Sequence, residues 1–109
     1  MLPRTMRLRH KSEFKTIFEQ GNSLPGKYMV IYVLSGKRKF GFIASKKVGN
    51  AVVRNRAKRL LREAIRLHLD DIKDNVQIIL IARTSIKGVS YIEVEQSLLR
   101  ILKKAHVLR

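Results

Sequence analysis

The segment Val76 to Ala82, which reads VQIILIA, constrains the fold more than any other part of the chain. Its long run of apolar and mostly β-branched residues predicts a strand in a covered, central position of a sheet. A chain of 109 residues has room for one domain with one core. We therefore expect residues 1–109 to form a single domain built around this strand.

Two earlier segments, Tyr28 to Leu34 and Lys39 to Ser45, are also apolar and β-branched. Because Ser35 to Arg38 between them can form a tight turn, the pattern predicts an antiparallel hairpin. The loosely composed stretch Gly21 to Gly26 predicts a loop, in which one extra short strand has room to form.

Three helices are expected around these strands. Ser12 to Gln20 has Phe14, Ile17 and Phe18 at helical spacing, with Ser12 as the N-cap and Gly21 as the stop. The pattern is helical again from about Ala51 to Leu69. A capping box at Ser90 and Glu93 then begins a last helix that reaches about Lys104. The order α, β, β, α, β, α, with the optional extra strand, indicates an α+β fold.

Charge decides the class of partner. The chain has 24 Lys and Arg against 8 Asp and Glu, a formal net charge of +16, so it is expected to bind a polyanion. It has no Cys, which excludes disulfides, thiolate zinc sites and a Cys nucleophile. Neither a signal peptide nor a membrane-spanning run is present, so we expect a soluble cytoplasmic protein without a membrane partner.

The segment Lys46 to Arg66 carries most of the functional signal, because Glu63 is its only acidic residue. At helical spacing, the apolar and basic positions fall on opposite sides. The apolar side holds Val53, Ala57, Leu60, Leu61, Ala64 and Ile65, and the basic side holds Arg54, Lys58, Arg59, Arg62 and Arg66. A solvated amphipathic helix is the alternative, but such faces usually mix signs of charge.

Phosphate is the anion that suits this face, since a guanidinium can hold a phosphate through two hydrogen bonds. The lead-in through Gly49 and Asn50 puts free backbone amides at the start of the helix, where they also favour an anion. Gly49 is equally well explained as a turn residue.

Catalytic and metal-binding patterns are missing. His10, His68 and His106 are separated and have no Cys partners, and no nucleophile motif or Gly-rich phosphate loop is present. We expect no catalytic residue and no metal site in the protein itself, although a weak cation role for the cluster Asp70, Asp71 and Asp74 stays open.

The segment Phe40 to Glu63, with its Arg54-Asn55-Arg56 triplet, closely resembles the signature of bacterial ribonuclease P protein subunits. Further matches lie near the start and in the late strand. They are Arg7-Leu8, Glu13-Phe14, Ile17-Phe18, Gly21 and Ile78 to Arg83. The chain departs from the family at Asn22 to Leu24 and at Asn75, which leaves loop contacts open.

The resemblance implies an α+β two-layer sandwich of the ribosomal S5 domain 2 type, in the order α-β-β-β-α-β-α. It also implies a left-handed β-α-β crossover, where pattern alone favours a right-handed one. In this family a catalytic RNA subunit cleaves precursor tRNA with Mg²⁺, and the protein is an accessory subunit that contacts that RNA and the single-stranded 5′ leader. No protein oligomer is required.

Carried over by position, the RNA-binding residues are those around the basic helix. They are Lys46, Lys47, Asn50, Arg54, Asn55, Arg56, Lys58, Arg59 and Arg62. The leader-binding cleft maps onto Phe14, Phe18, Tyr28 and Tyr32. The residues alone favour a core role for Phe14 and Phe18, and the resemblance favours the cleft. Because alternate strand residues share a face, Tyr28 and Tyr32 are expected to point together.

Two other functions are alternatives for so basic a chain. One is a ribosomal-type or general RNA-binding chaperone, which would have no preference for a precursor leader. The other is a DNA-binding protein that uses the basic helix in a groove.

Overall fold

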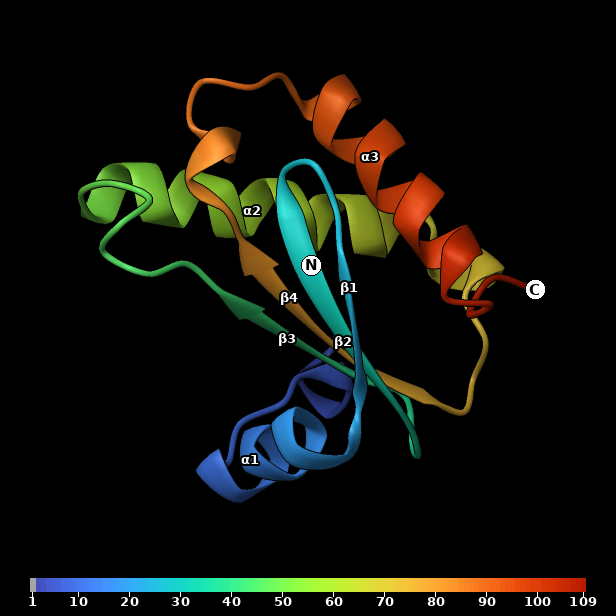
Figure 1. Ribbon diagram of the computed structural model, residues 1–109. Helices are drawn as coiled ribbons and strands as arrows, with labels where there is room; N and C mark the ends of the chain where they lie inside the picture. Colours follow the sequence, from blue (N-terminus) through green and yellow to red (C-terminus); the bar gives the residue numbers. More distant parts are fainter. Residues whose placement is uncertain (1) are drawn as a thin grey trace.

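The computed structural model describes residues 2–109 as three α-helices, three short 3-10 helices and one four-stranded sheet (Figure 1). The elements follow the chain in an order that begins with a 3-10 turn. They are η1 (Arg4–Met6), α1 (Lys11–Gln20), β1 (Asn22–Pro25), β2 (Met29–Ser35), β3 (Lys39–Ile43), α2 (Ala51–Leu67), η2 (Leu69–Asp71), β4 (Val76–Ala82), η3 (Thr84–Ile86) and α3 (Tyr91–Lys104). The expected order α-β-β-β-α-β-α is confirmed.

β4 lies inside the sheet, as its apolar sequence predicts, because the strand order is β1-β2-β4-β3. It pairs antiparallel with β2 along the whole length of both strands and parallel with β3. The predicted hairpin between β2 and β3 is therefore wrong: β4 lies between the two strands. The local turn pattern could not reveal this, since β4 arrives from a distant part of the sequence and covers an edge of each strand.

β1 is a short edge strand where the sequence favoured a loop. Asn22–Pro25 pairs antiparallel with β2 in a register that sets Ser23 opposite Tyr32. Pro25 is tolerated because an edge strand leaves one row of its backbone groups unpaired. Gly26 then closes a tight turn, since its N–H donates to the carbonyl of Met29 at 2.7 Å.

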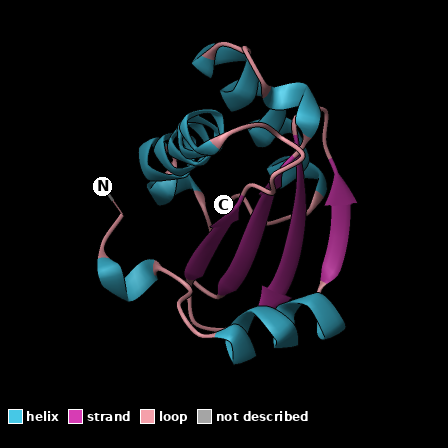
Figure 2. Ribbon diagram, turned by 90° about the vertical axis from the view of Figure 1, so that its left-hand side faces the viewer, coloured by secondary structure: helices cyan, strands magenta, loops and turns pink. Residues whose placement is uncertain are grey.

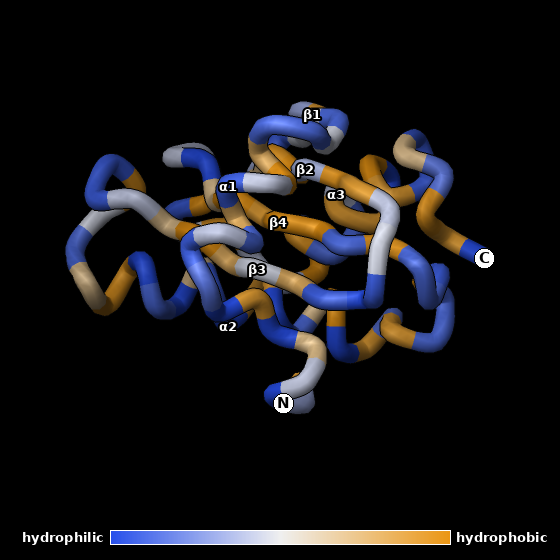
Figure 3. Tube along the Cα trace, turned by 90° about the horizontal axis from the view of Figure 1, so that it is seen from below, coloured by the Kyte–Doolittle hydropathy of each residue, from blue (hydrophilic) through white to orange (hydrophobic). Residues whose placement is uncertain are grey.

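Helices cover the two faces of the sheet unequally. α2 and α3 pack together over one face and bury the main core, with Ile31, Phe40, Ile78 and Leu80 fully enclosed. α1 crosses the other face and forms a smaller cluster around Ile17 (Figure 2). In Figure 3, β4 is mainly in hydrophobic colours, while the helices alternate between hydrophobic and hydrophilic residues along their length. α2 makes the crossover between β3 and β4, and the left hand of this crossover stays a prediction.

The helix ends follow from capping chemistry. The predicted capping box of α3 is confirmed: Ser90 Oγ accepts from the N–H of Glu93 at 3.3 Å, and the Glu93 carboxylate accepts from the N–H of Ser90 at 3.4 Å. Ser12, by contrast, is not the N-cap of α1. That helix begins at Lys11, because Glu13 reaches back to accept from the N–H of His10 at 3.2 Å.

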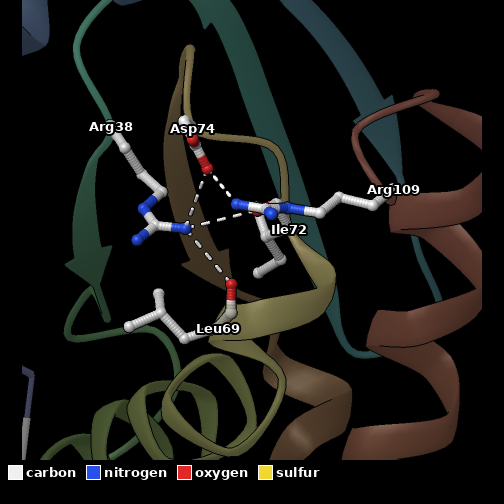
Figure 4. Close-up of polar contacts among 5 residues, drawn as sticks. All are labelled: Arg38, Leu69, Ile72, Asp74 and Arg109. Atoms are coloured by element: carbon white, nitrogen blue, oxygen red, sulfur yellow. Dashed lines mark hydrogen bonds and ion pairs between the residues drawn. The ribbon is translucent and has the colours of Figure 1, made fainter.

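Two arginines from distant parts of the chain hold the end of the sheet together around Asp74 (Figure 4). Arg38 donates to the carbonyls of Leu69 and Ile72, each at 3.2 Å. Arg109 also donates to the carbonyl of Ile72 at 3.2 Å and pairs with Asp74. These two positive charges serve the fold, so they are not part of a free basic surface.

No helix formed by residues 2–109 combines the length and apolar character needed to cross a membrane.

Candidate nucleic-acid interface

α2 buries one face and presents the rest of its surface to solvent or to its neighbours. Ala57, Leu61, Ala64 and Ile65 are buried against the sheet and α3, as the helical pattern predicts. The basic residues between them occupy the outer face and its flanks, half-buried or exposed. Asn55 and Arg59 are exposed, and Arg54, Arg56, Lys58 and Arg62 are half-buried.

The basic face of α2 is not neutralised by the acids of the described chain. Within residues 2–109, no ion pair includes Lys46, Lys47 or any predicted RNA-binding residue of α2. Arg66, at the end of the face, differs because its Nε donates to the Glu63 carboxylate at 3.0 Å. This hydrogen bond lowers the pKa of Glu63 and raises that of Arg66. Arg66 is thus the basic-face residue whose charge is already paired.

The segment before α2 is held by Gly49 and Asn50. Asn50 is the N-cap, since its Oδ1 accepts from the N–H of Val53 at 3.0 Å. Gly49 has φ of +155°, and a Cβ there would lie 2.9 Å from the Val53 side chain. The turn therefore needs glycine, and the Asn50 oxygen is committed to the helix. Lys46 and Lys47 remain exposed at this end.

Two of the predicted RNA-binding arginines have local contacts, and a third has an unpartnered buried nitrogen. Arg56 donates to the carbonyl of Val89 at 3.0 Å and so leans toward α3. The Arg62 guanidinium lies 5.5 Å from the centre of the Phe42 ring, within cation–π range. The buried Nε of Arg54 has no hydrogen-bond partner among residues 2–109. The contacts of Arg56 and Arg62 orient those side chains while leaving other N–H groups of each guanidinium to donate.

A row of side chains crosses the other face of the sheet under α1. In the strand register, Gly41 of β3, Ile79 of β4 and Tyr32 of β2 stand side by side. Phe14 lies over Gly41, and Phe18 meets Tyr32 edge to face with 4.9 Å between ring centroids. Three of the four residues predicted for the cleft are thus brought together, and the Phe18 side of the row is open to solvent at 39% exposure.

Tyr28 is not part of this row, which corrects the expectation that the two tyrosines point together. It lies just before the first residue of β2 and belongs to the buried core on the α2 and α3 side. There it borders a hollow with residues of α3, and Lys27 Nζ lies 5.3 Å from its ring. The alternation of strand residues does not extend to a position outside the paired strand.

A groove of about 500 Å³ runs along α1 beside the aromatic row. Phe14 and Phe18 supply its apolar surface, and Arg9 and Lys11 supply positive charge. Lys15 also lines the groove, where it pairs with Glu19 at 3.9 Å. Aromatic faces flanked by basic side chains suit an unpaired nucleic acid strand, whose bases stack while its phosphates meet the cations. The sequence predicted the aromatic residues of this groove, but its pattern did not single out the basic residues beside them.

The sequence matches the Ribonuclease P family over residues 2–106. The chain belongs to the ribonuclease P protein family. A curated ribonuclease P protein component from Clostridioides difficile is 38% identical over 108 residues, which cover 95% of each chain.

Solved ribonuclease P protein structures share the fold. One from Staphylococcus aureus, a mutant with defective mRNA degradation activity, has a TM-score of 0.89 and 32% identity and covers 95% of this chain and 91% of its own. Another from Thermotoga maritima has a TM-score of 0.82 and 30% identity and covers 90% of this chain and 96% of its own. Membership of the family implies a ribonucleoprotein endonuclease with an RNA subunit as partner.

Proposed function

We propose that this chain is the accessory subunit of a ribonuclease P that removes the 5′ leader of precursor tRNA. In this proposal the cleavage chemistry belongs to the RNA subunit, and the protein binds both that RNA and the leader. The observation that carries the proposal is the pairing of two surfaces: an uncompensated basic face on α2 and an aromatic groove along α1.

The two surfaces have different chemistry, and we assign them different RNAs. Folded RNA presents mainly phosphates and 2′-hydroxyls, which suit the arginines of α2 such as Arg54 and Arg59. An unpaired leader exposes its bases, which can stack on Phe18 and on the sheet surface next to it. Half-buried Ile43 and Ile81 extend this apolar surface beyond α1.

Mg²⁺ enters the proposal only through the RNA subunit. Among residues 2–109, no three His, Cys, Asp or Glu side chains come together as metal ligands would. The described residues do not fit a protein-bound Mg²⁺ site, so no step of the reaction is assigned to one. The protein's contribution is binding and positioning, in the cytoplasm where tRNA precursors are processed.

Preference for precursor over mature tRNA tests this function. The holoenzyme reconstituted with a bacterial ribonuclease P RNA at low Mg²⁺ is expected to bind precursor more tightly than mature tRNA. Changing both Phe14 and Phe18 to Ala should reduce that preference, since stacking contributes about 1–3 kcal/mol per base. The dissociation constants of the two tRNAs measure the effect.

Ile92→Ala is the matched control, because Ile92 is 62% exposed and lies on α3. It should leave the preference unchanged. A wild-type holoenzyme that binds precursor and mature tRNA equally would favour the general RNA-binding alternative instead.

A further inference from the structure

A second basic hollow lies at the amino end of α1 and is separate from the groove that the leader is proposed to occupy. Its volume is about 280 Å³, and its walls come from the N-terminal segment, the start of α1 and the start of β3. The charged side chains that line it include Arg4, Arg7, Arg9, Lys37, Lys39 and Glu13. We call it the N-terminal notch.

The notch is a fixed part of the fold. Residues 7 and 8 dock on β3, where the N–H of Leu8 donates to the carbonyl of Phe40 at 2.9 Å and Leu8 itself is buried. Arg7 donates to the carbonyl of Leu2 through Nε at 3.2 Å and Nη2 at 2.9 Å, and Arg9 donates to the carbonyl of Arg4 at 3.2 Å. These bonds hold the arginines where they are.

The positive charge in the notch exceeds what its acid can neutralise. Five Arg and Lys side chains line it, and Glu13 is the one carboxylate among its lining residues. Glu13 pairs with Lys39 at 2.9 Å, and this hydrogen bond lowers the pKa of Glu13. The side chains of Arg4 and Lys37 are exposed and form no ion pair within residues 2–109. Gathering such charges costs free energy that a bound anion would offset.

The notch continues the groove along α1. Arg9 lines both hollows, so the two meet at the amino end of the helix. Lys39 lies on the sheet face that the Phe14 ring covers, since Lys39 and Gly41 under that ring are alternate residues of β3. A strand that leaves the aromatic row past Arg9 therefore enters the notch directly.

We infer that the N-terminal notch binds backbone phosphates of the unpaired RNA strand after that strand has passed Phe18 and Phe14. The inference rests on the proposed function, because it takes the precursor leader as the occupant of the groove. The strand bends around the amino end of α1, where Arg4, Arg9 and Lys37 hold its phosphates.

The test uses the reconstituted holoenzyme and precursors whose leaders increase in length. Arg4→Gln with Lys37→Gln removes two charges without removing a side-chain hydrogen bond of the fold. Lys103→Gln with Lys104→Gln removes the same charge from exposed positions at the far end of α3 and is the matched control. Affinity is measured for each leader length and for mature tRNA over a range of salt concentrations.

For the notch variant, the affinity for precursor should stop rising at a shorter leader. For the wild type and the control, it should continue to rise with longer leaders. For precursor with a long leader, we plot the logarithm of the association constant against the logarithm of salt concentration. The slope for the notch variant should be shallower than that of the wild type by about 1.4, or roughly 0.7 for each lost contact with a single strand. Mature tRNA should bind the notch variant and the control equally.

Three results would overturn the inference. The notch variant could match the control on every leader, or it could lose affinity equally for precursor and mature tRNA, which would place the contact elsewhere in the complex. Thermal unfolding with and without inorganic phosphate is measured beside the binding assay. A notch variant that loses only the stabilisation by phosphate, with leader binding unchanged, would indicate a free-anion site. If the wild type itself shows no preference for precursor, the proposed function fails before the notch is tested.

Discussion

Gly41 shows how a single missing side chain shapes the proposed leader groove. A Cβ at this position would lie 2.6 Å from Cε1 of Phe14 and 3.1 Å from Cδ1 of Leu8. Glycine weakens a strand, and its presence often marks a close approach of another group. Here the group is the Phe14 ring, which lies directly on the backbone of β3.

Gly41→Ala should therefore displace Phe14 and lower both stability and leader preference. Overpacking of this kind costs about 1–3 kcal/mol, which urea unfolding will measure. Adding Phe14→Leu should recover stability without recovering the preference for precursor tRNA. If Gly41→Ala changes neither quantity, the ring does not depend on this contact.

Some side-chain contacts could not be predicted from the sequence. The basic pattern of α2 identified which positions face outward, but it could not show that Arg66 is paired with Glu63 or that Arg56 binds the carbonyl of Val89. Both contacts depend on rotamers and, for Arg56, on a distant segment. Tyr28 was misplaced because the strand it was assigned to begins one residue later.

At the scale of elements, His68 joins the end of α2 to α3. Its Nε2 lies 2.7 Å from Oε2 of Glu95, and its Nδ1 lies 3.4 Å from Oδ2 of Asp71. Tyr91 also donates to Glu95, and desolvation together with nearby carboxylates raises the pKa of Tyr91 to about 12. The hydrogen bond to Glu95 raises the pKa of His68, and the same bond lowers that of Glu95.

The contact between His68 and Glu95 predicts that the free energy of unfolding depends on pH. Because the folded pKa of His68 lies above the ordinary 6.5, its contribution is complete below 6.5 and is lost as pH rises through the folded value. The contribution of Glu95 is complete above the ordinary 4.5 and is lost as pH falls through its lowered value. Their joint effect should be greatest between these two pH values.

His68→Gln should therefore lower the free energy of unfolding more at about pH 6, where the imidazole is charged, than at about pH 9, where it is neutral. His106→Gln is the control, since His106 is exposed and lies near the C-terminus. Equal losses at both pH values would contradict the role given to the charged imidazole.

α2 itself makes a second prediction at this scale. Arg54→Gln and Arg62→Gln should each weaken binding to ribonuclease P RNA by about 1.5–3 kcal/mol, typical of hydrogen bonds to charged groups. Arg66→Gln should cost much less, because Glu63 already holds Arg66. Filter binding at constant salt will compare them, and equal losses for all three would mean that helix charge alone decides affinity.

The elements themselves were predictable where local chemistry defines them. α2, α3 and β4 followed from periodicity, capping and an apolar run. The pairing of strands did not, because which strand lies beside β2 depends on the return of the chain through α2. β1 was not predicted as a definite strand, because a short edge strand containing Pro25 has the composition of a loop.

For the whole molecule, the placement of the acids matters as much as the excess of basic residues. The ion pairs within residues 2–109 use basic residues outside the predicted RNA-binding set. Those residues are Lys15, Arg38, Lys39, Arg66, His68 and Arg109. The net charge of +16 is thus carried mainly by basic residues that form no ion pair within the described fold. The sequence predicted the excess, and the pattern of pairing emerged only from the structure.

The salt dependence of binding to ribonuclease P RNA tests this account most directly. If about six phosphates are neutralised at roughly 0.7 each, the logarithm of the association constant should fall linearly with the logarithm of salt concentration, with a slope near −4. A dissociation constant that hardly changes with salt would contradict the claim that the basic surface holds the RNA.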